Sequence, residues 1–218
     1  MKIRPEDLTE QNGFRHIITM KHSNMLPFVF QYMKTKTSLN FFFWMFNLGL
    51  IGYAIFSWIA QWIHGNMDWA ASVLYSFTGI LVFLLIIIPL HELIHLAGMR
   101  ILGAGKLHIS ANLRQGMFYA CADGFVMSRN EFFFVALLPF LLINLVLLYL
   151  IFSLNGVMVT GLWWIFLFHS TGCVGDFALM SFYQVNRDKE ILTYDDVAGG
   201  RSVFYQKLKE KDKLSYLV

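Results

Sequence analysis

Charged residues are scarce in this chain of 218 residues, since Asp, Glu, Lys and Arg make up only 14% of it. A soluble globular domain averages about 25% charged residues, whereas 57% of this chain is hydrophobic. The shortage of charge argues against an ordinary soluble domain and indicates a protein that crosses a membrane several times. We therefore expect the lipid bilayer as a partner, and no nucleic acid.

Cysteine is also rare. Cys121 and Cys173 lie far apart in different sequence environments, which does not suggest a disulfide framework. No removable signal peptide is expected, because the first forty residues are polar and the apolar run that begins at Phe41 is too long for one.

What the chain does contain is a set of apolar segments, each long enough to span a bilayer as a helix of roughly 20 residues. These segments cover residues 41–63, 70–102, 132–153 and 158–184. They are continuously apolar, not alternating, which favours helices over barrel strands. We expect an all-α membrane protein, a four-transmembrane-helix bundle over residues 41–186, with a cytoplasmic segment at 1–40 and a cytoplasmic tail at 187–218.

The basic residues predict the orientation of this bundle. All 17 Lys and Arg lie before the first span, after the fourth, or at and between the ends of the second and third. The connections "HGNMDW" and "SLNG" carry none. Because basic loops stay in the cytoplasm, both termini and residues 103–130 should face it. The stretch "MLPFVFQYM" near the N-terminus is expected either on the membrane surface or in a partly buried cytoplasmic segment.

Residues 107–126 differ from the spans, because they are rich in β-branched and aromatic residues on either side of Arg114-Gln115-Gly116. This pattern predicts a small cytoplasmic β-hairpin between the second and third spans. Ser128 and Glu131 then have the spacing of a capping box that opens the third span.

Two imidazoles and a carboxylate interrupt the second span in "HELIHLAGMR". The HExxH spacing puts His91 and His95 one turn apart on one helix face, as two ligands of one Zn²⁺ require, with Glu92 placed to act as general base on a metal-bound water. A charged group at this depth costs roughly 2.5–3.5 kcal/mol on insertion, so such groups usually serve function. A structural histidine pair and a proton or ion pathway are the other interpretations.

A catalytic zinc also needs a third protein ligand and an open position. The candidates are Asp176, Cys173, His169 and His108. At a rise of 1.5 Å per residue, Asp176 lies roughly 16 Å from the cytoplasmic end of its span, near the roughly 8–14 Å of the histidines. Asp176 is also the only acidic residue of the fourth span. It fits best, with Cys173 as a weaker alternative.

Three further residues lie near this candidate site. Pro89 should loosen the helix near Leu85 and widen the space around a metal. Asn144 and His169 are candidates for contact with a substrate, and an interhelical hydrogen bond is the alternative for each.

The stretches "HELIHLAGMRILG", "MSRNEFFFVALLPFLLIN" and "HSTGCVGD" resemble the membrane zincin peptidases, a family of small bacterial proteins, over residues 80–185. The order of elements is also similar to the core of the site-2 protease clan of intramembrane zinc metalloproteases. That resemblance implies His91, His95 and Asp176 as zinc ligands and Glu92 as the base, and a hairpin that offers an edge strand to an extended substrate. The clan has leucine before this aspartate and glycine after it, whereas Gly175 and Phe177 flank Asp176 here.

We therefore expect a zinc-dependent intramembrane endopeptidase that cuts a membrane protein or peptide substrate near the cytoplasmic side. The resemblance implies a bacterial inner membrane. A metal transporter or sensor that uses the same ligands without hydrolysis is the alternative. A non-catalytic scaffold is a further one, although it has no need of Glu92 beside both histidines.

Overall fold

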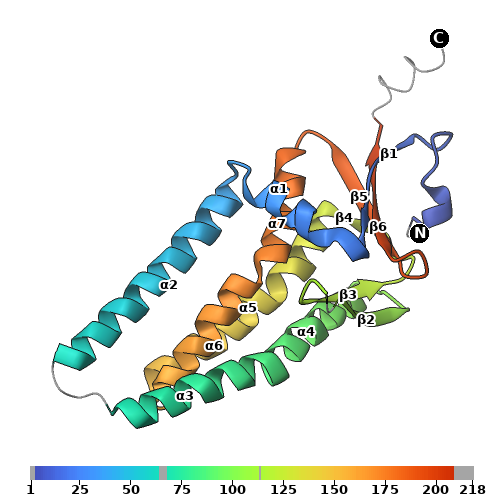
Figure 1. Cartoon of the computed structure of the whole chain (residues 1–218). Coiled ribbons are helices and arrows are strands. Elements are labelled where there is room, and N and C mark those ends of the chain that lie inside the picture. The colour runs from blue at the N-terminus through green and yellow to red at the C-terminus, as the bar shows by residue number, and fades with distance from the viewer. Residues whose placement is uncertain (1–2, 64–67, 113, 209–218) are drawn as a thin grey trace.

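Four long helical rods run through the molecule, and β-structure covers one end of them (Figure 1). The structure is a computed structural model, and it describes residues 3–63, 68–112 and 114–208. The rods are α2 (Ser38–Ile63), α3 with η3 and α4 (Trp69–Val82, Phe83–Ile87 and Ile88–Ile101), α5 (Arg129–Ser153), and α6 with α7 (Val159–Gly172 and Val174–Val185). Each rod is long and apolar enough to cross a membrane.

The expected fold class, an all-α bundle with one small β-hairpin, is only partly right, because the structure also contains a four-stranded antiparallel sheet. This sheet has the strand order β1-β6-β5-β4, and a second sheet pairs β2 with β3. The strands are β1 (Phe14–Lys21), β2 (Leu107–Asn112), β3 (Met117–Ala122), β4 (Met127–Ser128), β5 (Glu190–Asp196) and β6 (Arg201–Lys207). The larger sheet pairs an N-terminal strand with the C-terminal hairpin, and so distant a pairing leaves no local turn signal in the sequence.

The predicted β-hairpin is confirmed. Strands β2 and β3 pair from Leu107↔Ala122 to Asn112↔Met117, and Gly116 takes a positive φ of 63° in the turn between them. The predicted capping box is confirmed as well, because the backbone N–H and the hydroxyl of Ser128 both donate to Glu131 Oε2 at 2.8 Å. Helix α5 therefore begins immediately after β4.

A close contact between α3 and α6 fixes the rod that carries the HExxH motif. Gly79 faces Gly161, and a Cβ at Gly79 would stand only 2.5 Å from the carbonyl oxygen of Gly161. Small residues of this kind let membrane helices approach closely. Further along the rod, residues Phe83–Ile87 form a π-helical turn just before Pro89, as expected where proline removes a backbone donor.

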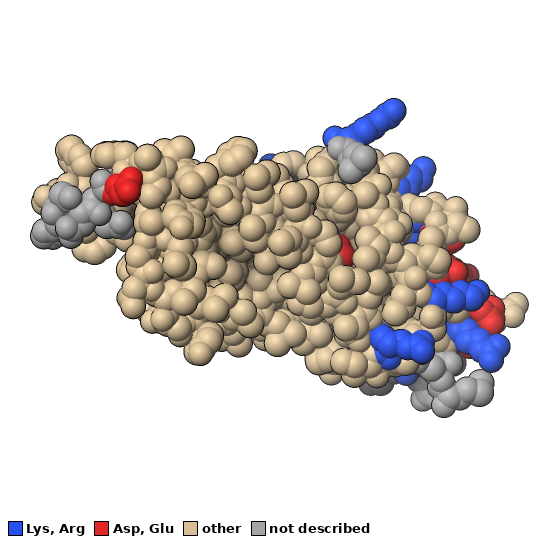
Figure 2. All heavy atoms as spheres, turned by 90° about the horizontal axis from the view of Figure 1, so that it is seen from below, with Lys and Arg blue, Asp and Glu red and all other residues tan. Residues whose placement is uncertain are grey.

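Helix α1 (Met25–Met33) contains the stretch "MLPFVFQYM" and packs on α7. Its Met25, Phe28, Val29 and Met33 are buried, so the interpretation as a partly buried segment is confirmed. The expected charge distribution is visible in Figure 2, where the basic side chains in view gather at the end of the molecule that carries the sheets.

Candidate metal centre

Helix α4 and the first turn of α7 bring three polar side chains to one point. Asp176 Oδ2 lies 3.3 Å from His91 Nε2, and Asp176 Oδ1 lies 3.3 Å from His95 Nε2. The two Nε2 atoms are 3.0 Å apart. The i and i+4 spacing places both rings on one face of α4, while the helical break at Cys173 starts α7 just before Asp176.

The outer partners of the histidines decide which ring nitrogen carries the proton. His95 Nδ1 lies 3.0 Å from the carbonyl oxygen of Val135, which can only accept, so Nδ1 is the donor. His169 Nδ1 donates to Asn144 Oδ1 at 2.8 Å, so its Nε2 is an acceptor for His91 Nδ1–H at 3.2 Å. In their neutral forms, His91 and His95 would therefore both direct the lone pair of Nε2 toward Asp176.

This arrangement fits a bound cation. With both rings neutral, two imidazole lone pairs and a carboxylate converge, and together they form one of the groups whose ligand atoms all lie within 4.8 Å. Tetrahedral zinc with bonds of about 2.0–2.1 Å places neighbouring ligand atoms about 3.3 Å apart, close to the spacing here. The set of two histidines and one carboxylate is also the chemistry of catalytic zinc sites.

Glu92 stands next to this group. It is only 6% exposed, and one of its oxygens accepts the backbone N–H of Ala120 in β3. Its other oxygen, Oε2, is buried and has no hydrogen-bond partner among the described residues. A buried carboxylate oxygen without a donor is costly, and Glu92 lines the same cavity as the three candidate ligands.

A cavity of about 480 Å³ opens onto the group. It is lined by His91, Glu92, His95 and Asp176 at one side, and by residues of α1 and of strand β3 at the other. The hairpin and α1 thus form a cover over the candidate ligands. The cover is held by Gln115, whose Oε1 accepts from the backbone N–H of Met25 at 3.2 Å and whose Nε2 donates to the carbonyl of Ser23 at 2.8 Å.

Comparison with known families supports the same interpretation. The family model described as "Putative zincin peptidase" matches residues 84–190, which include the HExxH motif, the hairpin and Asp176. The chain belongs to this family. Comparisons with curated proteins and with solved structures gave no match.

The region matched by the family model contains Asp176, Cys173 and His169, the three membrane residues that the sequence offers as a third ligand. The structure distinguishes them by their positions relative to the two histidines. Asp176 lies against both histidines. Cys173 Sγ lies 4.0 Å from His91 Nδ1 and 3.8 Å from His169 Nε2, on the outer side of the His91 ring. His108 is exposed on β2 and does not line the cavity.

The two candidates for substrate contact are also placed. His169 lines the cavity and is 2% exposed, while Asn144 is 4% exposed. The interhelical hydrogen bond considered for Asn144 is confirmed by its contact with His169. Their contact with a substrate stays a prediction.

Sequence reasoning missed the covering elements. Nothing in the sequence indicates that α1 and Gln115 lie above the candidate ligands. The stretch "MLPFVFQYM" is equally compatible with a helix on the membrane surface, and Gln115 is compatible with an ordinary turn position. Their position above the ligands follows from α1 packing on α7 and from the strand β1 paired with β6.

Proposed function

We propose that this zincin family member is a zinc-dependent intramembrane endopeptidase that hydrolyses peptide bonds of membrane-embedded or membrane-adjacent substrates. One observation carries the proposal: Glu92, whose Oε2 has no hydrogen-bond partner among the described residues, lines the same cavity as the converging ligand atoms of His91, His95 and Asp176. A structural histidine pair has no use for an unsatisfied carboxylate at this place.

The residues have separate roles in this proposal. His91, His95 and Asp176 would hold Zn²⁺, which supplies Lewis acidity that polarises a peptide carbonyl and lowers the pKa of a water to about 7. Glu92 would accept a proton from the attacking water and deliver it to the amine of the leaving peptide. The hydrogen bond from Ala120 would hold Glu92 in place for both transfers.

The proposed cut lies near the cytoplasmic face of the membrane. The candidate ligands belong to long apolar helices. Figure 1 shows α4 and α7, which carry them, next to the sheets, and Figure 2 shows the basic side chains in view at that end of the molecule. Because basic segments stay in the cytoplasm, that end would face it, with both termini on the same side. The family resemblance supports a bacterial inner membrane as the location.

Strand β3 offers a way to hold an extended substrate. The N–H groups of Ala120 and Ala122 point away from β2, because one donates to Glu92 and the other to Asp195. By the alternation of an antiparallel ladder, the N–H of Phe118 lies on this same edge, and Phe118 also lines the cavity. Because the N–H groups of Ala120 and Ala122 are already bonded, a substrate strand would pair through the N–H of Phe118, which brings its backbone close to Glu92, as the likeness to the site-2 protease clan also implies.

The proposal is tested by Glu92→Gln in purified protein, with Glu190→Gln on the exposed face of β5 as the matched control. A mixture of synthetic peptides that each contain one membrane span serves as the probe, with products read by mass spectrometry. Glu92→Gln should keep its zinc and lose cleavage by a factor of about 10²–10⁴, the usual contribution of a general base. Unchanged cleavage by this variant would reject the mechanism.

A metal transporter or sensor is the second candidate function, and one observation favours it. His91, His169 and Cys173 form another group of donor atoms within 4.8 Å, so potential ligands continue past the first three. Proteoliposomes loaded with a zinc-sensitive dye would separate the two functions. Transport predicts zinc entry that Glu92→Gln does not abolish, whereas the peptidase predicts no entry.

A further inference from the structure

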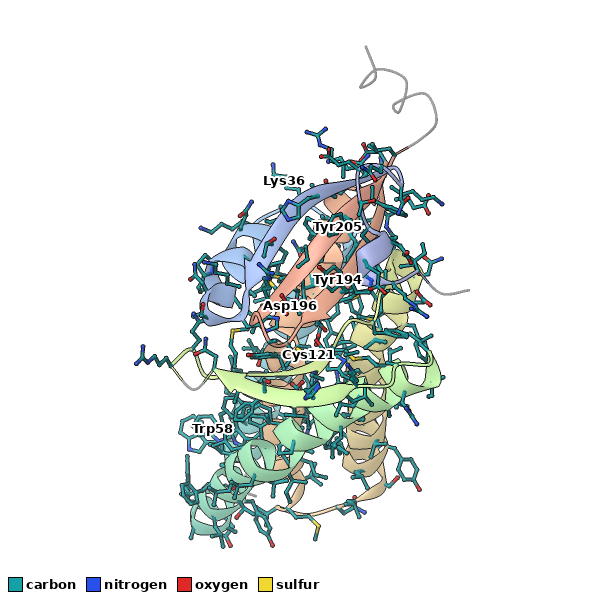
Figure 3. The ribbon with its side chains drawn as sticks, turned by 90° about the vertical axis from the view of Figure 1, so that its right-hand side faces the viewer. Lys36, Trp58, Cys121, Tyr194, Asp196 and Tyr205 are labelled. Atoms are coloured by element: carbon teal, nitrogen blue, oxygen red, sulfur yellow. The ribbon has the colours of Figure 1, made fainter. Side chains whose placement is uncertain are left out.

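A second cluster of ligand-type side chains lies outside the membrane helices. His22 begins the short helix η2 (His22–Asn24) after β1, Cys121 lies in β3, and Asp195 lies in β5. Their donor atoms all lie within 4.8 Å of one another, and all three residues are buried. Figure 3 shows Cys121 where the hairpin meets the sheet, with Asp196 of β5 just beyond it. The cluster therefore joins three segments that are distant in the sequence.

Hydrogen bonds already hold these side chains close. The hydroxyl of Ser202 donates to Asp195 Oδ1 at 2.7 Å and lies 3.0 Å from His22 Nε2. The backbone N–H of Ala122 donates to Asp195 Oδ2 at 3.2 Å. Small movements would bring an imidazole nitrogen, a thiol sulfur and a carboxylate oxygen to one ion, with the Ser202 hydroxyl or a water as a fourth ligand.

The chemistry of the cluster favours a divalent cation. Burial raises the pKa of the Cys121 thiol and that of the Asp195 carboxyl, and burial lowers the pKa of His22. His22 in its neutral form has a ring lone pair that a metal can bind, and the thiol and the carboxyl supply the two anionic ligands. A divalent ion bound by one thiolate, one carboxylate and a neutral imidazole leaves the buried cluster with no net charge. Thiolate, imidazole and carboxylate are the ligand types that zinc uses.

We propose that His22, Cys121 and Asp195 form a second zinc site, separate from the one in the membrane, that fastens the hairpin and the N-terminal segment to the sheet. Zinc bound here would link residues that are far apart in the chain. Links that close long loops stabilise a fold most, because they remove the most conformational entropy from the unfolded chain. Strand β3 also lines the cavity of the first site, so this zinc sets the position of the cover above it. The proposal does not depend on peptidase activity.

The test uses the full chain without a polyhistidine tag, purified in detergent under reducing conditions, loaded with zinc and desalted. Elemental analysis should find two zinc ions per chain. Cys121→Ser should retain one, while the matched variant of the other cysteine, Cys173→Ser, should retain two. After exchange to cobalt, a thiolate-to-cobalt charge-transfer band in the near ultraviolet should vanish in Cys121→Ser and persist in Cys173→Ser.

Serine at position 121 can still donate to Asp195, so Cys121→Ser is expected to fold, and circular dichroism would verify this. His22→Gln is a second variant that should lose the same zinc. If wild type binds a single zinc that Cys121→Ser retains, the cluster is a hydrogen-bonded junction only and the proposal is overturned. A His91→Ala/His95→Ala variant, which lacks the membrane site, should keep one zinc and the cobalt band. The second site is therefore tested independently of the proposed peptidase site.

Discussion

His91 Nδ1 lies 3.2 Å from His169 Nε2, 78 residues further along the chain. His169 in turn donates to Asn144 Oδ1 at 2.8 Å. This buried series of bonds crosses from α4 through α6 to α5, and it leaves the Nε2 lone pair of His91 directed toward Asp176. Partners that bond the outer nitrogen of a metal-binding histidine fix its orientation and its tautomer, and this is the role that the geometry gives to His169.

His169→Phe should weaken zinc binding at the membrane site by about 10–100-fold, the usual effect of losing an outer partner of a ligand. Phenylalanine fills the space but accepts no hydrogen bond from His91. Competition with a chromogenic chelator measures the affinity. Thr171→Val is the control, because the Thr171 hydroxyl bonds only carbonyls of its own helix, Leu167 and Phe168. Equal affinities for both variants would contradict this role.

Asp176→Ala should lose one equivalent of zinc, because two neutral imidazoles without a carboxylate bind the ion poorly. Elemental analysis of the loaded protein measures the loss. Chelator treatment of wild type should abolish cleavage of the span-containing peptides, and added zinc should restore it. Asp188→Asn, at an exposed position just after the end of α7, is the control. An Asp176→Ala protein with full zinc content would show that another residue is the third ligand.

Gly79→Ala should destabilise the fold by about 1–3 kcal/mol, as overpacking usually does. The new methyl group would meet the backbone of Gly161, which cannot rotate away. Gly52→Ala in α2 is the matched control, since a Cβ there has nothing within 4 Å. Thermal unfolding in detergent compares the two. A Gly79→Ala protein as stable as Gly52→Ala would mean that α3 and α6 are further apart than described.

Gln115→Ala should loosen the cover of the cavity, because it removes the side-chain bonds to Met25 and Ser23. Each bond contributes about 1 kcal/mol, so amide hydrogen exchange in the first turn of α1 should become several-fold faster. Arg114→Ala, at the exposed neighbouring position, should leave that exchange unchanged. If the two variants exchange alike, Gln115 does not hold the cover.

The free energy of unfolding of the zinc-free protein should depend on pH because of the buried carboxyl of Asp195. Burial raises the pKa of this carboxyl in the folded chain, so the folded state keeps its proton at a pH where the unfolded state has lost it. The free energy of unfolding should therefore fall as pH rises from about 4, the ordinary aspartate value, through the raised folded value. Asp195→Asn should reduce this fall. Denaturant titrations across pH measure it, and an unchanged slope would contradict the prediction.

The sequence alone was sufficient for the features that depend on local order. Each of these features leaves a local pattern in the sequence. The apolar runs predict the helices, the HExxH spacing predicts that the two histidines share one helix face, and the Arg114-Gln115-Gly116 turn predicts the hairpin. Depth along a helix is also a local quantity, because the rise per residue is fixed. Depth therefore favours Asp176 as the partner of His91 and His95.

Only the tertiary structure decided which distant groups meet. The pairing of β1 with β6, the cover made by α1 and Gln115, and the bond from His169 to His91 depend on how whole elements pack. The same is true of His22, Cys121 and Asp195, which share no spacing that a motif could reveal. Side-chain direction across a gap between elements is set by packing, and a linear sequence carries no direct record of it.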